Sequence, residues 1–151
     1  MDLSSPEMKD IVEAVQALDQ GDKAGARKRL LELWEAHSAN GARLHMSVAA
    51  HFLADTEDGA SEEMEWDLRA LEAATGSRDA EDHEPLSPDF VTFLPSLHGS
   101  VANGYRLLGD RERARRHVEI AVARSAVLAD DDYGQLVRNG LRRLQAGVGM
   151  T

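Results

Sequence analysis

The chain has 151 residues, with 17 Lys and Arg against 27 Asp and Glu, and it contains no Cys. This length suits one domain, and a hydrophobic fraction of 42% with 29% charged residues is typical of a globular protein. The lack of Cys excludes disulfides and thiolate catalysis, and a net charge of −10 argues against nucleic acid or an anionic membrane as a partner. Because residues 1–20 carry acids where a signal peptide has bases and an apolar stretch, we expect a cytoplasmic protein.

The negative charge is concentrated in the middle of the chain. Residues 55–90 carry 13 acids and two bases, whereas residues 91–151 carry nine Arg and six acids. These two regions can attract each other within one fold or between copies of the chain. A solvated surface of uneven charge is the simpler interpretation, since exposed ion pairs are worth under ~1 kcal/mol.

Helical spacing recurs through the first half of the chain, while strand patterns are nearly absent. The first apolar stripe consists of Met8, Ile11, Val12, Val15 and Leu18. It predicts a helix that ends near Gly21. Further helices are expected over residues 22–37, 42–56 and 61–75.

The second half begins with a polar loop over residues 77–86, which has no periodicity. A short helical turn is expected from Ser87 to Phe93, and Pro95 fits the first position of the helix that follows. Helices are then expected over residues 95–108, 110–128 and 131–146. The sequence therefore predicts an all-α domain of seven helices, with about three quarters of the residues helical.

Two Gly-Asp pairs, Gly21-Asp22 and Gly109-Asp110, have matching surroundings. Each Gly is followed by an Ala five residues later and by an apolar residue four further on. Small or aromatic residues stand seven and four positions before each Gly. This pattern is typical of close helix pairs, in which Gly takes a left-handed turn and Asp caps the second helix.

These pairs resemble the tetratricopeptide-repeat family, which stacks helix pairs of about 34 residues. The pair over about 95–128 matches best, the pair over about 7–37 matches in part, and the pair over 42–75 matches poorly. The resemblance implies a single domain over residues 1–151, a short right-handed solenoid of three antiparallel pairs. It also implies an insertion at 77–94 and a capping helix over about 131–146. As a whole the chain looks like small stand-alone repeat proteins of bacteria.

The resemblance also implies a concave groove, lined by the first helix of each pair, that binds a peptide or a partner protein. The groove positions of the family fall on His45, Phe52, Asp55, Asn103 and Arg106, among others. Arg106 can bind a carboxylate through paired N–H donors, with Asn103 beside it. An apolar strip from Met8 to Leu18 is either part of this groove or simply core.

Motifs for chemistry are weak. His51 and Asp55 stand one turn apart on one helix face, which suits acid–base catalysis or two ligands of a metal. His45 and His98 are the candidates for a third ligand, but neither is expected on that face. Because no phosphate-binding loop or nucleophile elbow is present either, we expect no metal and no cofactor.

We therefore expect a non-enzymatic interaction module that binds a peptide or protein segment in its groove. One alternative is a small-molecule binder or enzyme with a pocket closed by residues 77–94. Its lining would consist of His45, His51, Asp55, His98 and Arg106, with His51, Asp55 and His98 as the catalytic candidates. A further alternative is an oligomeric structural protein, in which the acidic centre of one copy meets the basic end of another.

Overall fold

The computed structural model describes residues 5–150 and is built of helices joined by turns, with no strand in that range. Its seven α-helices are α1 (Lys9–Asp19), α2 (Lys23–Asn40), α3 (Arg43–Ala54), α4 (Ala60–Thr75), α5 (Leu94–Leu107), α6 (Arg111–Arg124) and α7 (Asp132–Gly147). Helix covers 75% of the chain, which confirms the predicted all-α class. The helix expected to reach residue 128 ends at Arg124 and continues as a short 3-10 turn.

The two Gly-Asp corners are formed as predicted. Gly21 and Gly109 have φ angles of 87° and 84°, in the left-handed region that favours glycine. Asp22 accepts a hydrogen bond from the Gly25 amide at 2.9 Å, and Asp110 accepts one from the Arg113 amide at 3.1 Å. Each Asp thereby caps the helix that follows it.

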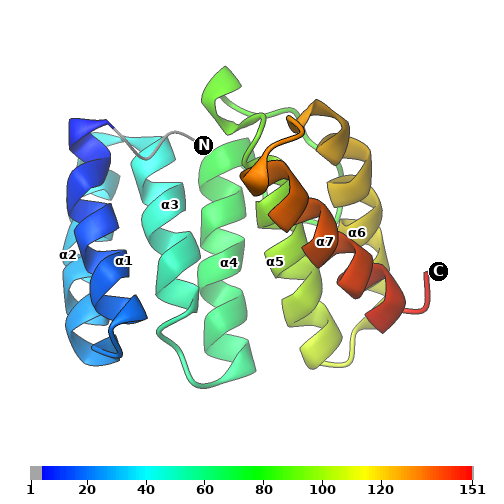
Figure 1. Cartoon of the computed structure of the whole chain (residues 1–151), viewed down its shortest axis with the longest axis horizontal. Coiled ribbons are helices and arrows are strands. Elements are labelled where there is room, and N and C mark those ends of the chain that lie inside the picture. The colour runs from blue at the N-terminus through cyan, green and yellow to red at the C-terminus, as the bar shows by residue number, and fades with distance from the viewer. Residues whose placement is uncertain (1–4, 151) are drawn as a thin grey trace.

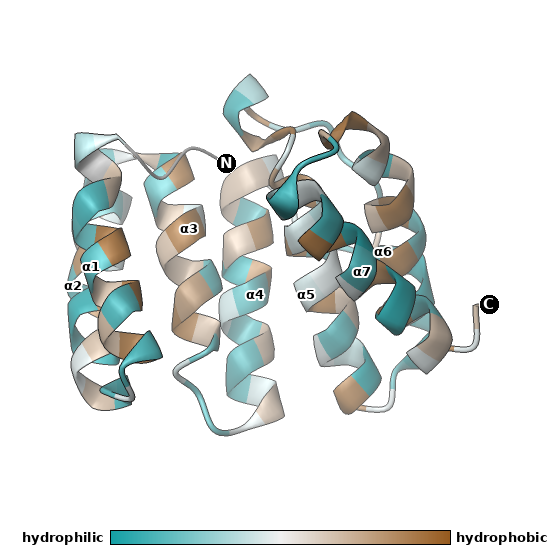
Figure 2. Ribbon diagram, in the orientation of Figure 1, coloured by the Kyte–Doolittle hydropathy of each residue, from teal (hydrophilic) through white to brown (hydrophobic). Residues whose placement is uncertain are grey.

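The first six helices stand side by side and alternate in direction along the molecule (Figure 1). Each helix packs on the next one in the chain, and α1 also touches α3. The largest group of buried side chains lies between α1 and α5 and includes Leu30, Val48, Leu53, Leu71 and Leu97. Helix α3 is apolar over most of its length (Figure 2), and its neighbours enclose it.

Helix α7 breaks this row. It lies obliquely across α5 and α6, and it contacts both of them (Figure 1). Its N-terminus is capped by Asp131, which accepts a hydrogen bond from the Gly134 amide at 2.8 Å. Much of its outward side is hydrophilic (Figure 2). This placement leaves a space between α7 and the earlier helices, and the candidate site lies there.

Ion pairs hold the segment between α4 and α5 against α6. Arg116 of α6 lies 3.4 Å from Glu81, and Arg124 of α6 lies 2.8 Å from Asp82 and 3.3 Å from Glu84. The acidic middle and the basic end of the chain therefore attract each other within one fold. No helix among residues 5–150 is both long enough and apolar enough to cross a bilayer.

Candidate functional site

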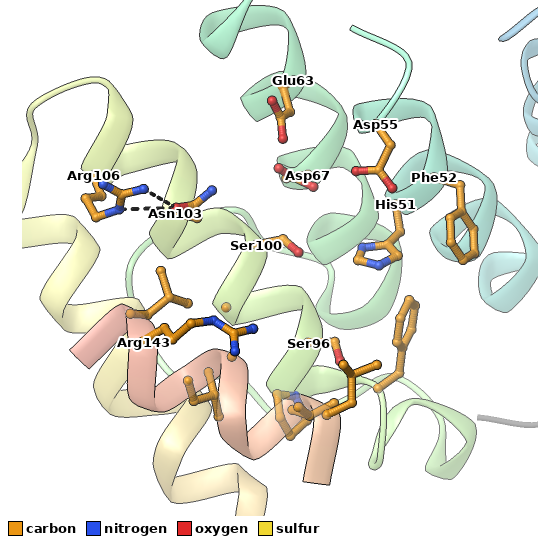
Figure 3. A pocket seen from close by; sticks show the side chains of 18 of the residues that line it. His51, Phe52, Asp55, Glu63, Asp67, Ser96, Ser100, Asn103, Arg106 and Arg143 are labelled. Atoms are coloured by element: carbon orange, nitrogen blue, oxygen red, sulfur yellow. Dashed lines mark hydrogen bonds between the residues drawn. The ribbon is translucent and has the colours of Figure 1, made fainter. Parts of the chain in front are cut away.

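A cavity of about 960 Å³ lies between α3, α4, α5 and α7 (Figure 3). Its volume falls in the range of ligand-binding cavities, roughly 300–1,000 Å³. Helix α7 supplies its most apolar wall, which consists of Leu136, Val137, Leu141 and Leu144. Gly99 on α5 permits the close approach of α7, because a Cβ at this position would lie 3.3 Å from Leu141.

One end of the cavity is acidic. Asp55 lies at the end of α3, and Glu63 and Asp67 lie one turn apart on α4 (Figure 3). Asp67 is only 4% exposed, and burial, together with the charges of Glu63 and Asp55, raises its pKa to about 8. Burial and Glu63 also raise the pKa of Asp55. We call these three residues the acidic end of the cavity.

His51 lies beside the acidic end on α3 and packs against two aromatic rings. Its ring centroid is 5.2 Å from that of Phe52 and 5.3 Å from that of Phe93, both in edge-to-face geometry. Its Nδ1 is buried and has no hydrogen-bond partner among the described residues. Burial lowers the pKa of His51 to about 4, so the ring is neutral at neutral pH.

Two arginines line another part of the cavity. Arg106 donates from Nε and Nη2 to Oδ1 of Asn103, at 3.2 Å and 2.9 Å, and this contact holds the guanidinium in one orientation (Figure 3). Its Nη1 donors are not used in any of these bonds, so they are available to an anion. Arg143 projects from α7 toward the same space. The cavity thus carries opposite charges on different walls.

Four of the five predicted groove residues line this cavity, namely Phe52, Asp55, Asn103 and Arg106. The fifth, His45, lies outside it and stacks on His37 with ring centroids 4.8 Å apart. Two residues of the apolar strip of the first helix, Met8 and Ile11, are fully buried in the core. For these two residues the core interpretation holds.

The alternative catalytic set is not brought together. His51 and Asp55 both line the cavity, but no hydrogen bond joins their side chains in the part of the chain that the structure describes. His98 is 1% exposed between α5 and α6, where its Nδ1 lies 2.9 Å from the Nδ1 of His117. Burial lowers the pKa of His98 to about 3 and that of His117 to about 4. His98 is therefore a neutral core residue.

The expected lid is also different. Of residues 77–94, only Phe93 lines the cavity. The rest of this segment is held by its ion pairs to α6, whereas α7 lines one side of the cavity. The expectation that residues 77–94 close the pocket is therefore wrong, since the cavity is open to solvent and only Phe93 of this segment reaches it.

Sequence reasoning missed the importance of Asp67. A signal was present, because Met64, Asp67 and Leu71 fall at helical spacing on one face, and the two apolar members are buried. An acid within such a stripe is unusual, since buried carboxylates are rare unless they are paired. A helix was expected over residues 131–146, but the position of α7 across the cavity from α3 depends on tertiary packing.

Among residues 5–150 no group of three His, Asp or Glu side chains is arranged to hold a metal ion. Comparison with models of protein families, with curated proteins and with solved structures finds no match to this chain.

Proposed function

We propose that this chain is a non-enzymatic binding module of the tetratricopeptide-like type, which holds a peptide segment in the cavity between α3, α4, α5 and α7. The observation that carries the proposal is the cavity itself. It is large, lies across several helices and combines an apolar wall with groups of both charges. A peptide offers apolar side chains, charged side chains and backbone polar groups, so it matches all three features.

Local geometry supports the repeat assignment. The turns between α1 and α2 and between α5 and α6 share a left-handed Gly followed by a capping Asp. These turns lie 88 residues apart in the sequence, yet they are alike in φ angle and in cap. Helix α7 contacts both members of the last pair, as a capping helix of a solenoid would.

The arrangement of side chains favours binding over catalysis. His51 is not joined by a hydrogen bond to Asp55 or to a serine of the cavity within the described chain, so no nucleophile–base pair is assembled around it. Asn103 holds Arg106 in place, and Phe52 borders the cavity. Arginine and aromatic side chains are enriched among the residues that dominate binding energy, and both kinds line this cavity.

The proposal is tested by selecting peptides from a displayed random library on the full chain, and then measuring the affinity of one selected peptide by calorimetry. We expect Arg106→Ala and Phe52→Ala each to weaken binding by about tenfold or more. Arg142→Ala is the matched control, because Arg142 is exposed on α7, bonds only to Asn139 and does not line the cavity. Its affinity should equal that of the wild type.

A blocking variant makes the test sharper. Ser100 is half-buried on α5 and lines the cavity, so Ser100→Trp would place an indole ring in the binding space. We expect this variant to abolish peptide binding while circular dichroism remains that of a helical protein. Equal binding by the wild type and Ser100→Trp, or no enrichment of any peptide, would refute the proposed function.

The cavity volume also favours a second candidate, a small-molecule binder. The space is close to the upper limit for such sites, and its mainly apolar lining carries a few polar groups, as ligand pockets do. Native mass spectrometry of the purified protein distinguishes the candidates. A small molecule that is retained by the wild type and lost in Ser100→Trp would favour the second one.

The structural-protein alternative has less support. The acidic and basic regions that it would pair between copies already form ion pairs within one chain, between α6 and residues 81–84. Light scattering over a salt series tests this alternative directly, and we expect a monomer at low salt.

A further inference from the structure

The acidic end of the cavity has three carboxylates and no positive partner. Asp55, Glu63 and Asp67 make no ion pair and no side-chain hydrogen bond with any other described residue, although all three line the same space. Their mutual repulsion is unfavourable, because like charges that approach closely disfavour ionisation. Asp67, which is almost fully buried, largely avoids this repulsion near neutral pH by keeping its proton, since its pKa is raised to about 8, and a cation bound beside it would favour release of that proton.

Groups of the chain that lie nearby do not compensate these charges. His51 is neutral at neutral pH, because burial lowers its pKa. Arg106 and Arg143 also line the cavity, but neither forms an ion pair or a hydrogen bond with Asp67, and Arg106 bonds to Asn103 through its Nε and Nη2. Burial and the charges of Glu63 and Asp55 raise the pKa of Asp67. Among residues 5–150, no ion pair therefore neutralises Asp67.

A buried polar group without a partner is rare in native proteins, and each case requires an explanation. Asp67 is not sealed inside the core, because its carboxyl group faces the cavity (Figure 3). A ligand can therefore reach it. His51 lies on the same side of this space, and its buried Nδ1 also lacks a partner among the described residues. The carboxyl group of Asp67 is therefore the group at this end that a ligand can reach and pair with.

The neighbouring surface suits the stem of a long basic side chain. Phe52 is half-buried, borders the cavity and packs against His51, whereas Phe93 is 1% exposed and offers a ligand almost no surface. Lysine and arginine bury their methylene groups against apolar surface while the charged end finds polar partners. The ring of Phe52 and the carboxyl groups together provide both kinds of contact.

We propose that Asp55, Glu63 and Asp67 bind the positively charged end of a basic side chain, an ammonium or a guanidinium group, carried by the peptide segment that occupies the cavity. This inference rests on the proposed function and adds the chemical class of the group that is recognised. It also predicts the orientation of the bound peptide. The basic residue of the peptide would lie beside α4, and Arg106 would remain available for an acidic group elsewhere on the peptide.

The test uses small probes first, so that it does not depend on finding a peptide. Nα-acetyl-lysine methylamide and Nα-acetyl-arginine methylamide are titrated into the full chain and followed by amide chemical shifts. Nα-acetyl-norleucine methylamide is the neutral control of similar shape. We expect the basic probes to shift amides of α3, α4 and α5 around the cavity at millimolar concentration and the neutral probe to have little effect. The arginine and lysine arms decide between the guanidinium and the ammonium group.

Matched variants separate the cavity from general attraction to an acidic protein. Glu63→Gln and Asp67→Asn should each weaken binding of the preferred probe by about tenfold. Glu35→Gln removes the same charge from an exposed position on α2 and should leave the affinity unchanged. Equal affinities for the basic and neutral probes, or equal losses in Glu63→Gln and Glu35→Gln, would overturn the inference.

Selected peptides then distinguish this inference from the proposed function. If peptides bind the cavity and a change of their Lys or Arg to Gln weakens binding by about tenfold, both proposals hold. If the same change has no effect, the acidic end is not the recognised feature, although peptide binding stands. If the basic probes bind and no peptide does, the cation site stands and the proposed function fails.

Discussion

Replacement of Asp67 by Asn should stabilise the protein near neutral pH. The folded chain raises the pKa of this carboxyl group from 3.8 to about 8, mainly by burial. A carboxyl group with a raised pKa contributes full stability below its unfolded value, and that contribution is lost as the pH rises toward the folded value. At pH 7 the wild type therefore bears a cost that an uncharged side chain of the same shape avoids.

The magnitude follows from the size of the shift. Each pKa unit corresponds to about 1.4 kcal/mol, so between pH 3.8 and pH 7 the cost reaches about 4 kcal/mol. The Asn amide is itself buried without a partner, which costs about 1–2 kcal/mol. We expect a net stabilisation of about 2–3 kcal/mol at pH 7, which turns into a net destabilisation of about 1–2 kcal/mol by pH 4, where only the cost of the buried amide remains.

Urea unfolding of the full chain, followed by circular dichroism at several pH values, measures this difference. Glu35→Gln serves as the control, since an exposed change of the same charge alters stability by less than about 0.5 kcal/mol. A free-energy difference between Asp67→Asn and the wild type that stays constant from pH 4 to pH 8 would refute the reasoning. Destabilisation by Asp67→Asn at pH 7 would refute it as well.

Two further predictions concern the fold. His98 and His117 have pKa values in the folded chain below the usual 6.5, so their contribution to stability is full above pH 6.5. This contribution should decrease as the pH falls toward 4, by up to about 1.4 kcal/mol per pH unit for each residue. Acid unfolding of the Asp67→Asn variant measures this slope, because the carboxyl group of Asp67, whose effect on stability has the opposite sign, is absent. Gly109→Ala should destabilise by about 1 kcal/mol, because its φ of 84° strains any other residue, although no atom lies within 4 Å of the added Cβ. Gly140→Ala should stabilise the protein by about 0.5–1 kcal/mol, since the helical Gly140 on α7 has room for a Cβ. In thermal unfolding, the melting temperature should therefore fall for Gly109→Ala and rise for Gly140→Ala.

Local signals in the sequence were sufficient for the helices and their turns. The stripe of the first helix and the caps at Asp22 and Asp110 depend on residues three or four positions apart, so they can be recognised without tertiary information. The end of α6 could not be placed as well. The 3-10 turn at Ser125–Val127 preserves much of the helical pattern, and the sequence does not distinguish the two.

The site was predicted only in part, because it depends on how distant segments pack. Phe52 and Arg106, which the family resemblance placed in a groove, both line the cavity. The lid was assigned incorrectly, since ion pairs from Arg116 and Arg124 hold residues 81–84 against α6. The burial of Asp67 results from contacts of α4 with both of its neighbours, and no local pattern gives its pKa.

Peptide binding in the cavity is tested most directly by mapping the amide chemical shifts that change when a display-selected peptide is added to the full chain. We expect the largest changes on α3, α4, α5 and α7 around the cavity, and we expect them to vanish in Ser100→Trp. Changes confined to α1, α2 or the outer surface of α6, with the cavity amides unmoved, would contradict it.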